Sequence, residues 1–107
     1  MKTTRARVNP ARCCTPLEAQ DRHVAAFKAL SHLRRLQIFF ALVRSGGALT
    51  VGEIARRVRI PGPTLSHHLD VLRRAGLLSS RKEERFVYCS VEKEIVTDLV
   101  RLLTACC

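Results

Sequence analysis

The stretch 60–78, with the sequence IPGPTLSHHLDVLRRAGLL, constrains the fold of this chain more than any other. A turn with two prolines precedes Leu65, Leu69 and Leu72, and this i, i+4, i+7 spacing predicts a helix with one buried face. Gly76 follows as the left-handed residue that ends many helices. The opposite face carries hydroxyl, imidazole and guanidinium groups, which suit base edges and phosphates. We therefore expect one side of this helix in a core and the other side against a partner.

The segments on both sides of this helix complete a known supersecondary arrangement. Thr50 and Glu53 have the spacing of a capping box, and they predict a short helix that ends before the prolines. Segments 77–81 and 85–91 follow as two predicted strands, the second with strict alternation, joined by a charged connection. Short helix, turn, long helix and hairpin together predict a winged helix-turn-helix domain, mainly α with a β-hairpin wing.

Three further helices are predicted around this unit, within a domain that covers 15–107 and follows a flexible basic arm at 1–14. The first helix is expected to start at a capping box of Thr15 and Glu18, to run to about residue 30, and to bury Val24, Phe27 and Leu30. The second ends near residue 44, and its core stripe is Leu36, Phe39, Phe40 and Val43.

The last helix, over about 92–105, has a wider apolar face than one core needs. This face comprises Ile95, Val96, Leu99, Val100, Leu102 and Leu103. We interpret the excess as a dimer surface that the last helix shares with the first helix.

Charge and length restrict the function classes. A chain of 107 residues forms one domain, and its net charge of +10 favours a polyanionic partner, nucleic acid before membrane surface. No apolar run is long enough to span a bilayer and no secretory leader is visible, so a cytoplasmic protein is expected. No acid–base or phosphate-loop constellation appears, so we expect no enzyme and no catalytic residue. A non-specific nucleoid protein is the competing nucleic-acid reading.

Candidate DNA contacts come from the long helix and from the wing. The helix offers Thr64, Ser66 and His67 to base edges or phosphates, whereas His68 is expected to face the interior as a hydrogen-bonded side chain. Arg73 either contacts phosphate or is solvated. The wing adds Arg81, Lys82 and Arg85, each able to reach phosphates.

At this point the chain resembles the ArsR/SmtB family of dimeric winged-helix repressors over about 22–105. The motifs that carry the resemblance are FKALS with RRL soon after, then TLSHHL at 64–69, then LRRAGLL at 72–78. The resemblance implies a homodimer through the first and last helices. It also implies a recognition helix in the major groove of an inverted-repeat operator, with release when an effector binds.

The chain also departs from the family's pattern. Gly62 stands before Pro63 where polar residues usually open the recognition helix, and Glu84 lies where the wing turn often has glycine. The third-helix cysteine motif for metalloids is absent from 48–58. Asp98 stands alone in the last helix without paired histidines, so the family's zinc site there is not expected.

The cysteines indicate the trigger. Some arsenic-responsive members carry a vicinal pair before the first helix, as Cys13 and Cys14 do here, and others carry one after the last helix, as Cys106 and Cys107 do. Trivalent arsenic or antimony is thiophilic and suits three thiolates, so these four cysteines are the candidate ligands for As(III) or Sb(III). The site is expected to combine the two chain ends, within or between subunits.

Other readings of the cysteines and histidines stay open at this stage. Persulfide or another oxidant, or a different soft metal, can act on the same thiols. Cys89 is expected to be a buried small hydrophobe in a strand. His23 and His32 lack partners at ligand spacing, so surface or capping roles are expected for them.

Overall fold

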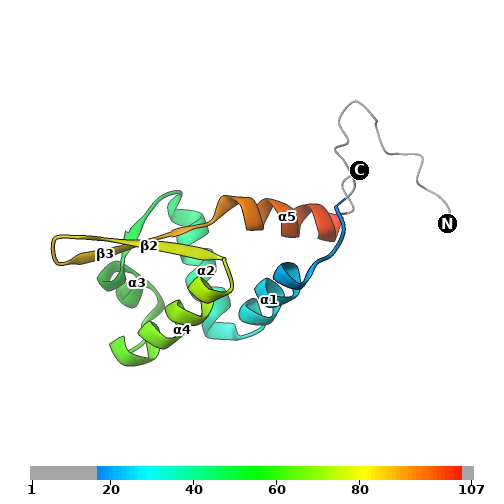
Figure 1. The fold of residues 1–107 in the computed structure, drawn as a ribbon. Coiled ribbons are helices and arrows are strands. Elements are labelled where there is room, and N and C mark those ends of the chain that lie inside the picture. The colour runs from blue at the N-terminus through cyan, green and yellow to red at the C-terminus, as the bar shows by residue number, and fades with distance from the viewer. Residues whose placement is uncertain (1–16, 105–107) are drawn as a thin grey trace.

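The computed structural model describes residues 17–104, which form a winged helix-turn-helix domain (Figure 1). The described part contains five helices and three strands, so the predicted fold class is confirmed. In chain order the elements are α1 (Asp21–Leu30), α2 (Leu33–Ser45), β1 (Leu49–Thr50), α3 (Val51–Val58), α4 (Gly62–Arg74), β2 (Leu78–Glu83), β3 (Phe86–Val91) and α5 (Lys93–Thr104). The predicted arm at 1–14 lies outside the described residues.

The core forms where α4 packs against α2 and α3. Leu65, Leu69 and Leu72 of α4 are buried, as their spacing predicts, and they meet Ile38 of α2 and Ile54 of α3 in one cluster. The helix ends in a Schellman motif, because the N–H of Leu77 donates to the carbonyl of Leu72 at 3.0 Å. Gly76 has φ +81°, which a residue with a Cβ rarely adopts, so its predicted role as the cap is confirmed.

The wing is wider than the predicted hairpin, because a third strand joins it. β2 and β3 pair antiparallel through a two-residue turn, and Glu84 takes the left-handed position of that turn with φ +57°. β1 pairs with the other edge of β3, where Thr50 lies opposite Tyr88, giving the order β1-β3-β2. The sequence did not predict β1, since two residues are too few to show alternation. Thr50 also caps α3 in the predicted box with Glu53.

The first helix starts later than predicted. Residues 17–20 are not helical, and Gln20 is the N-cap of α1. The backbone N–H of Gln20 donates to Nδ1 of His23 at 2.9 Å, so a histidine takes the place that Glu18 was expected to hold. The predicted box therefore is wrong in its acidic member, and Thr15 lies outside the described residues.

The inner faces of α1 and α2 are also rotated from the prediction. α1 buries His23, Ala26 and Ala29, whereas Val24 and Phe27 are 48% and 37% exposed. On α2, Phe39 is buried as predicted, and Ile38 and Leu42 complete the buried stripe. The predicted Phe40 and Val43 are instead 46% and 44% exposed. Apolar spacing shows that a helix has an apolar stripe, but it does not show which residues of that stripe face the core of the domain.

The last helix confirms the expected excess of apolar surface. Ile95 and Leu99 of α5 pack into the core. Val100 and Leu103 are 53% and 73% exposed. Large apolar side chains at this exposure are typical of a surface that another molecule covers.

Candidate nucleic-acid interface

The solvent-facing side of α4 presents the three predicted contact residues together. Thr64, Ser66 and His67 are all exposed, because they lie on the face of the helix opposite its buried leucines. No described side chain caps the helix at its N-cap, Pro61. The first N–H groups of α4 therefore remain available to an acceptor, and the positive end of the helix dipole favours an anion there.

In the C-terminal half of α4, one acid partly offsets two arginines. Asp70 accepts from Nε of Arg74 at 2.9 Å, and Arg73 Nη1 lies 3.3 Å from the other carboxylate oxygen. The hydrogen bond from Arg74 lowers the pKa of Asp70, so the carboxylate is ionised at neutral pH. Arg73 is exposed but held in this ion pair. A phosphate contact by Arg73 therefore requires competition with Asp70.

His68 faces the interior, as predicted. Its ring is 6% exposed, and its Nδ1 lies 3.4 Å from Nη1 of Arg35 on α2. Arg35 also donates to the carbonyl of Ala29 at 2.7 Å, so one guanidinium joins α1, α2 and α4. Burial, followed by the nearby His32 ring and Arg35, lowers the pKa of His68. The neutral ring therefore acts as the acceptor that holds the inner side of the candidate recognition helix.

His32 has the capping role that was expected for it. Its ring nitrogen accepts from the backbone N–H of Arg34 at 3.2 Å, at the N-terminus of α2. The His32 ring also lies beside the His68 ring, with 4.8 Å between their centroids.

The three predicted basic residues of the wing differ in their contacts with neighbouring side chains. Arg81 donates to Glu83 at 2.6 Å and lies over the Tyr88 ring, 5.3 Å from its centroid. The hydrogen bond to Glu83 raises the pKa of Arg81. Arg85 occupies the turn, 5.8 Å from the centroid of Phe86, and Lys82 is exposed on β2. Lys82 and Arg85 form no ion pair with any described carboxylate, so they offer more uncompensated charge than Arg81 does.

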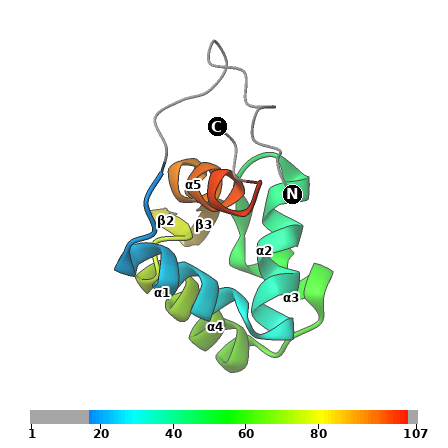
Figure 2. The ribbon, with the colours of Figure 1, turned by 90° about the vertical axis from the view of Figure 1, so that its right-hand side faces the viewer.

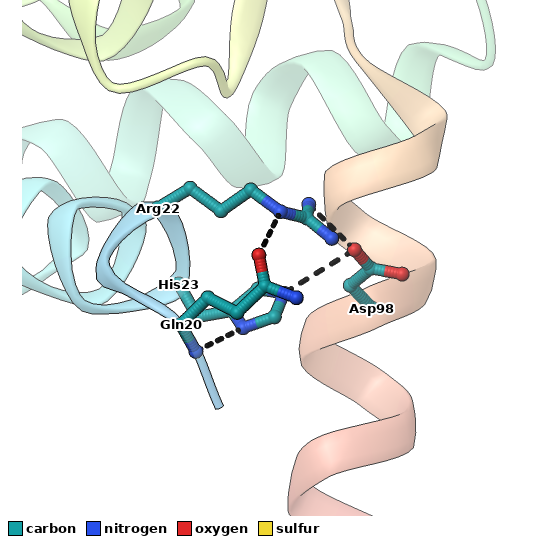
Figure 3. Close-up of polar contacts among 4 residues, drawn as sticks. All are labelled: Gln20, Arg22, His23 and Asp98. Atoms are coloured by element: carbon teal, nitrogen blue, oxygen red, sulfur yellow. Dashed lines mark hydrogen bonds and ion pairs between the residues drawn. The ribbon is translucent and has the colours of Figure 1, made fainter. Parts of the chain in front are cut away.

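A polar cluster joins α1 to α5 (Figure 3). Asp98 of α5 lies 2.7 Å from Nη1 of Arg22 and 3.3 Å from Nε2 of His23. Since Nδ1 of His23 accepts from Gln20, its proton is on Nε2 and is donated to Asp98. Arg22 and then His23 lower the pKa of Asp98. Arg22 reaches back to Oε1 of Gln20 at 3.3 Å.

Two expectations are corrected by this cluster. Asp98 does not stand alone, and His23 is 1% exposed rather than on the surface. The sequence signal was a histidine within the inner face of α1, but its partner lies 75 positions away and spacing cannot find it. The capping role expected for His23 is confirmed by its bond with Gln20.

The comparisons with known proteins agree with this geometry. A family model described as a helix-turn-helix domain matches residues 30–81. The transcriptional repressor SdpR of Bacillus subtilis is 35% identical over 74 residues, which is 69% of this chain and 80% of SdpR. The transcriptional activator HlyU of Vibrio cholerae is 38% identical over 80 residues, 75% of this chain and 72% of HlyU.

Solved structures give the same result. The crystal structure of an ArsR family transcriptional regulator superposes with a TM-score of 0.70 at 26% identity, covering 82% of this chain and 89% of that one. The chain belongs to the ArsR/SmtB family. A homodimeric winged helix-turn-helix DNA-binding domain from Mycobacterium bovis, described as a possible ArsR-family regulator, has a TM-score of 0.67 at 27% identity and covers 79% of this chain and 78% of its own. This ArsR/SmtB protein is therefore a DNA-binding transcription regulator.

The cysteines of this ArsR/SmtB regulator are divided between described and undescribed parts. Cys13, Cys14, Cys106 and Cys107 lie outside the described residues. Cys89 is buried in β3, and burial raises the pKa of its thiol, as expected for a small core hydrophobe rather than a ligand. Within 17–104 no group of three or more His, Cys, Asp or Glu side chains is placed to hold a metal ion.

The described ends of the chain are brought to one end of the domain. The segment that leads into α1 and the C-terminal end of α5 both lie at the end of the domain opposite the tip of the wing (Figure 1). Among the described helices, none is long and apolar enough to cross a membrane.

Proposed function

We propose that this protein is an ArsR-type repressor that binds an inverted-repeat operator as a homodimer. In this proposal trivalent arsenic or antimony binds thiolates from Cys13, Cys14, Cys106 and Cys107, and the loaded protein leaves its operator. α4 reads the major groove with Thr64, Ser66 and His67, and the wing residues contact the flanking backbone. The family and the DNA-binding fold stand independently of the effector.

Exposed apolar residues on α1 and α5 support the homodimer. Val24 and Phe27 of α1 and Val100 and Leu103 of α5 are all more than a third exposed. The two helices lie next to each other, joined by the Asp98 cluster, so their outer faces combine into one surface. A self-complementary surface of this kind suits a two-fold dimer, which matches an inverted repeat in DNA.

The link between α1 and α5 is the observation that carries the effector proposal. Arg22 and His23 on α1 both contact Asp98 on α5, which holds the two helices that lead to the cysteine pairs. Cys14 precedes Leu17 by three residues and Cys106 follows Thr104 by two. An extended chain spans at most about 3.6 Å per residue, which limits these distances to about 11 Å and about 7 Å.

The chemistry of the four thiols supports As(III) or Sb(III). Thiolates are soft ligands, and a vicinal pair supplies two of the three that a pyramidal site needs. The third thiolate has to come from the other chain end, of the same subunit or its partner. Binding then ties the N-terminal segment to α5, which is next to the dimer surface. Such a tie biases the dimer only if it differs between the free and the DNA-bound states.

A serine scan of the cysteines tests the proposal. Operator DNA is labelled with fluorescein, and its release by arsenite is followed by anisotropy in the presence of reductant. Cys106→Ser with Cys107→Ser, and separately Cys13→Ser with Cys14→Ser, should leave DNA affinity unchanged and abolish release. Cys89→Ser is the matched control and should still be released. Full release of either double variant by arsenite would overturn the proposed site.

A second trigger is favoured by one comparison. A solved structure of a relative, 34% identical over 81% of this chain, is described as reduced HlyU, so the redox state was specified for that protein. In this alternative, persulfide or another oxidant links the thiols as disulfides and releases the operator. Absorbance titration separates the two. An arsenic–thiolate absorbance band that forms under reductant and requires three cysteines favours arsenic. Release of DNA only after oxidation favours the redox trigger.

A further inference from the structure

A groove on the outer side of α2 and α3 is used by neither the DNA interface nor the dimer surface. It has a volume of about 380 Å³, and its lining residues come from α2 and α3 alone. Figure 2 shows these two helices together at one side of the domain. No residue of α4, the wing, α1 or α5 lines the groove, so it is separate from the residues assigned to DNA and to the dimer surface.

Positive charge surrounds this groove, and no described acid forms an ion pair with it, although Glu53 interacts with Arg57 over a longer distance. Arg34 and Arg44 come from α2 and Arg57 comes from α3. Every ion pair among the described residues uses other cations, so these three guanidinium groups face no described carboxylate within 4.0 Å. Arg34 donates to the neutral Oε1 of Gln37 at 3.0 Å, which orients it without neutralising it. None of the lining residues is acidic.

The floor between the arginines is apolar. Phe40, Ala41 and Val58 line it, and Phe40 is 46% exposed although its spacing suggested a core position. An exposed aromatic ring within a ring of arginines is typical of a protein-binding site, where an apolar anchor is surrounded by charge contacts. DNA backbone needs cations but has no use for an apolar floor.

We infer that this groove, which we call the α2–α3 groove, docks an acidic protein segment that carries an apolar side chain. Carboxylates of the segment pair with Arg34, Arg44 and Arg57, and a leucine or phenylalanine of the segment packs on Phe40. Guanidinium groups suit this role because their planar fork binds carboxylates through two hydrogen bonds. The partner can be held while the protein is bound to its operator.

The test uses the full-length protein and a defined probe. The probe is the fluorescein-labelled peptide Asp-Glu-Leu-Phe-Asp-Glu, and its anisotropy is measured at about 0.15 M salt to screen long-range attraction. Wild-type protein should bind it saturably. Arg44→Gln with Arg57→Gln should weaken binding about fivefold to tenfold, since each partly exposed ion pair contributes a few-fold in affinity. A control peptide, in which serine replaces both Leu and Phe, should bind wild-type protein about as weakly as the probe binds the double variant.

A charge-matched pair provides the control. Arg56→Gln with Arg59→Gln removes the same charge from α3 and its C-cap but not from the lining of the groove, and should change peptide affinity less than about twofold. Both double variants should bind operator DNA equally and keep the wild-type oligomeric state.

Four outcomes overturn the proposal. Equal weakening by both double variants means general attraction to a basic protein. A selective loss of operator affinity in Arg44→Gln with Arg57→Gln assigns the groove to DNA, and a change in oligomeric state assigns it to a second copy. Absence of saturable peptide binding to wild-type protein also overturns it. None of these results bears on arsenite release, so the proposed function is tested separately.

Discussion

Nε2 of His23 on α1 lies 3.3 Å from Oδ2 of Asp98 on α5, and the two residues are 75 positions apart in the chain. The histidine is 1% exposed, and its other ring nitrogen is occupied by the N–H of Gln20. One ring thus joins the start of the first helix to the middle of the last. Both nitrogens are satisfied in one tautomer only.

We expect His23→Ala to destabilise the protein by about 1–3 kcal/mol, because it leaves a void and removes both hydrogen bonds. Urea unfolding followed by circular dichroism measures this. Asp98→Asn should also lower stability, and Arg22→Gln should lower it less, because the Arg22 side chain is 50% exposed. A variant His23→Ala as stable as Arg22→Gln would contradict the role assigned to the buried ring.

Acidic pH should weaken the packing of α4 through His68. The pKa of His68 is lowered in the folded protein, first by burial, then by the charges of His32, Arg35, His67 and Arg34. The unfolded chain therefore takes up this proton at a higher pH than the folded protein does. Stability is then complete at higher pH and declines as the pH falls through the ordinary histidine range.

The measurement is the free energy of unfolding between about pH 7.5 and about pH 5.5, where unperturbed histidines titrate. His68→Gln keeps an acceptor for Arg35 and should give a shallower decline than wild type. His67→Gln removes only a minor cause of the lowered pKa of His68, so it should change the slope less than His68→Gln does. Identical slopes in wild type and His68→Gln would show that His68 does not cause the decline.

Replacing Ser66 and His67 with alanine should reduce the affinity for operator DNA more than the affinity for random DNA. Both side chains are exposed on α4, and the helix itself is held by its buried leucines, so the fold should survive. We expect operator binding to weaken about tenfold to a hundredfold, as for the loss of base contacts. Competition with random DNA at fixed salt measures it. Equal weakening on both DNAs would mean that these residues contact only the backbone.

Glu83→Gln should strengthen DNA binding by releasing Arg81. The carboxylate of Glu83 holds the Arg81 guanidinium at 2.6 Å, so its removal frees one cation on the wing. The slope of log affinity against log salt should steepen by about one, the value for one added phosphate contact.

Glu84→Gln removes the same charge from the turn and serves as the control for Glu83→Gln. If Arg81 is the released cation, the gain from Glu83→Gln should disappear in the Arg81→Gln background, while any gain from Glu84→Gln should remain. A gain from Glu83→Gln that persists without Arg81 would attribute it to net charge alone.

Local chemistry predicted the helix-turn-helix unit well. The box of Thr50 and Glu53, the leucine spacing of α4 and the glycine at its end each act within a few residues, and each is confirmed. The interior position of His68 also followed from periodicity, because it lies on the same side of the helix as Leu65 and Leu72.

Relationships across the chain were not accessible in this way. Phe40 and Val24 are apolar at helical spacing, but whether such residues meet the core or solvent depends on how the helix is rotated against its neighbours. The partner of His23 and the strand β1 depend on segments far away in sequence. The DNA contacts and the effector cysteines remain predictions, since the first needs DNA and the second lies outside the described residues.

The pairing of Thr50 with Tyr88 has a consequence for how an operator is released. Thr50 belongs to β1 and also caps α3, so the hairpin is hydrogen-bonded directly to the start of the helix-turn-helix unit. Wing and recognition helix therefore act as a single stiff template for one half-site. In the proposed mechanism the effector binds cysteines that flank α1 and α5 rather than residues within this template. We therefore expect it to change the distance and angle between the two templates of a dimer, so release should depend on half-site spacing.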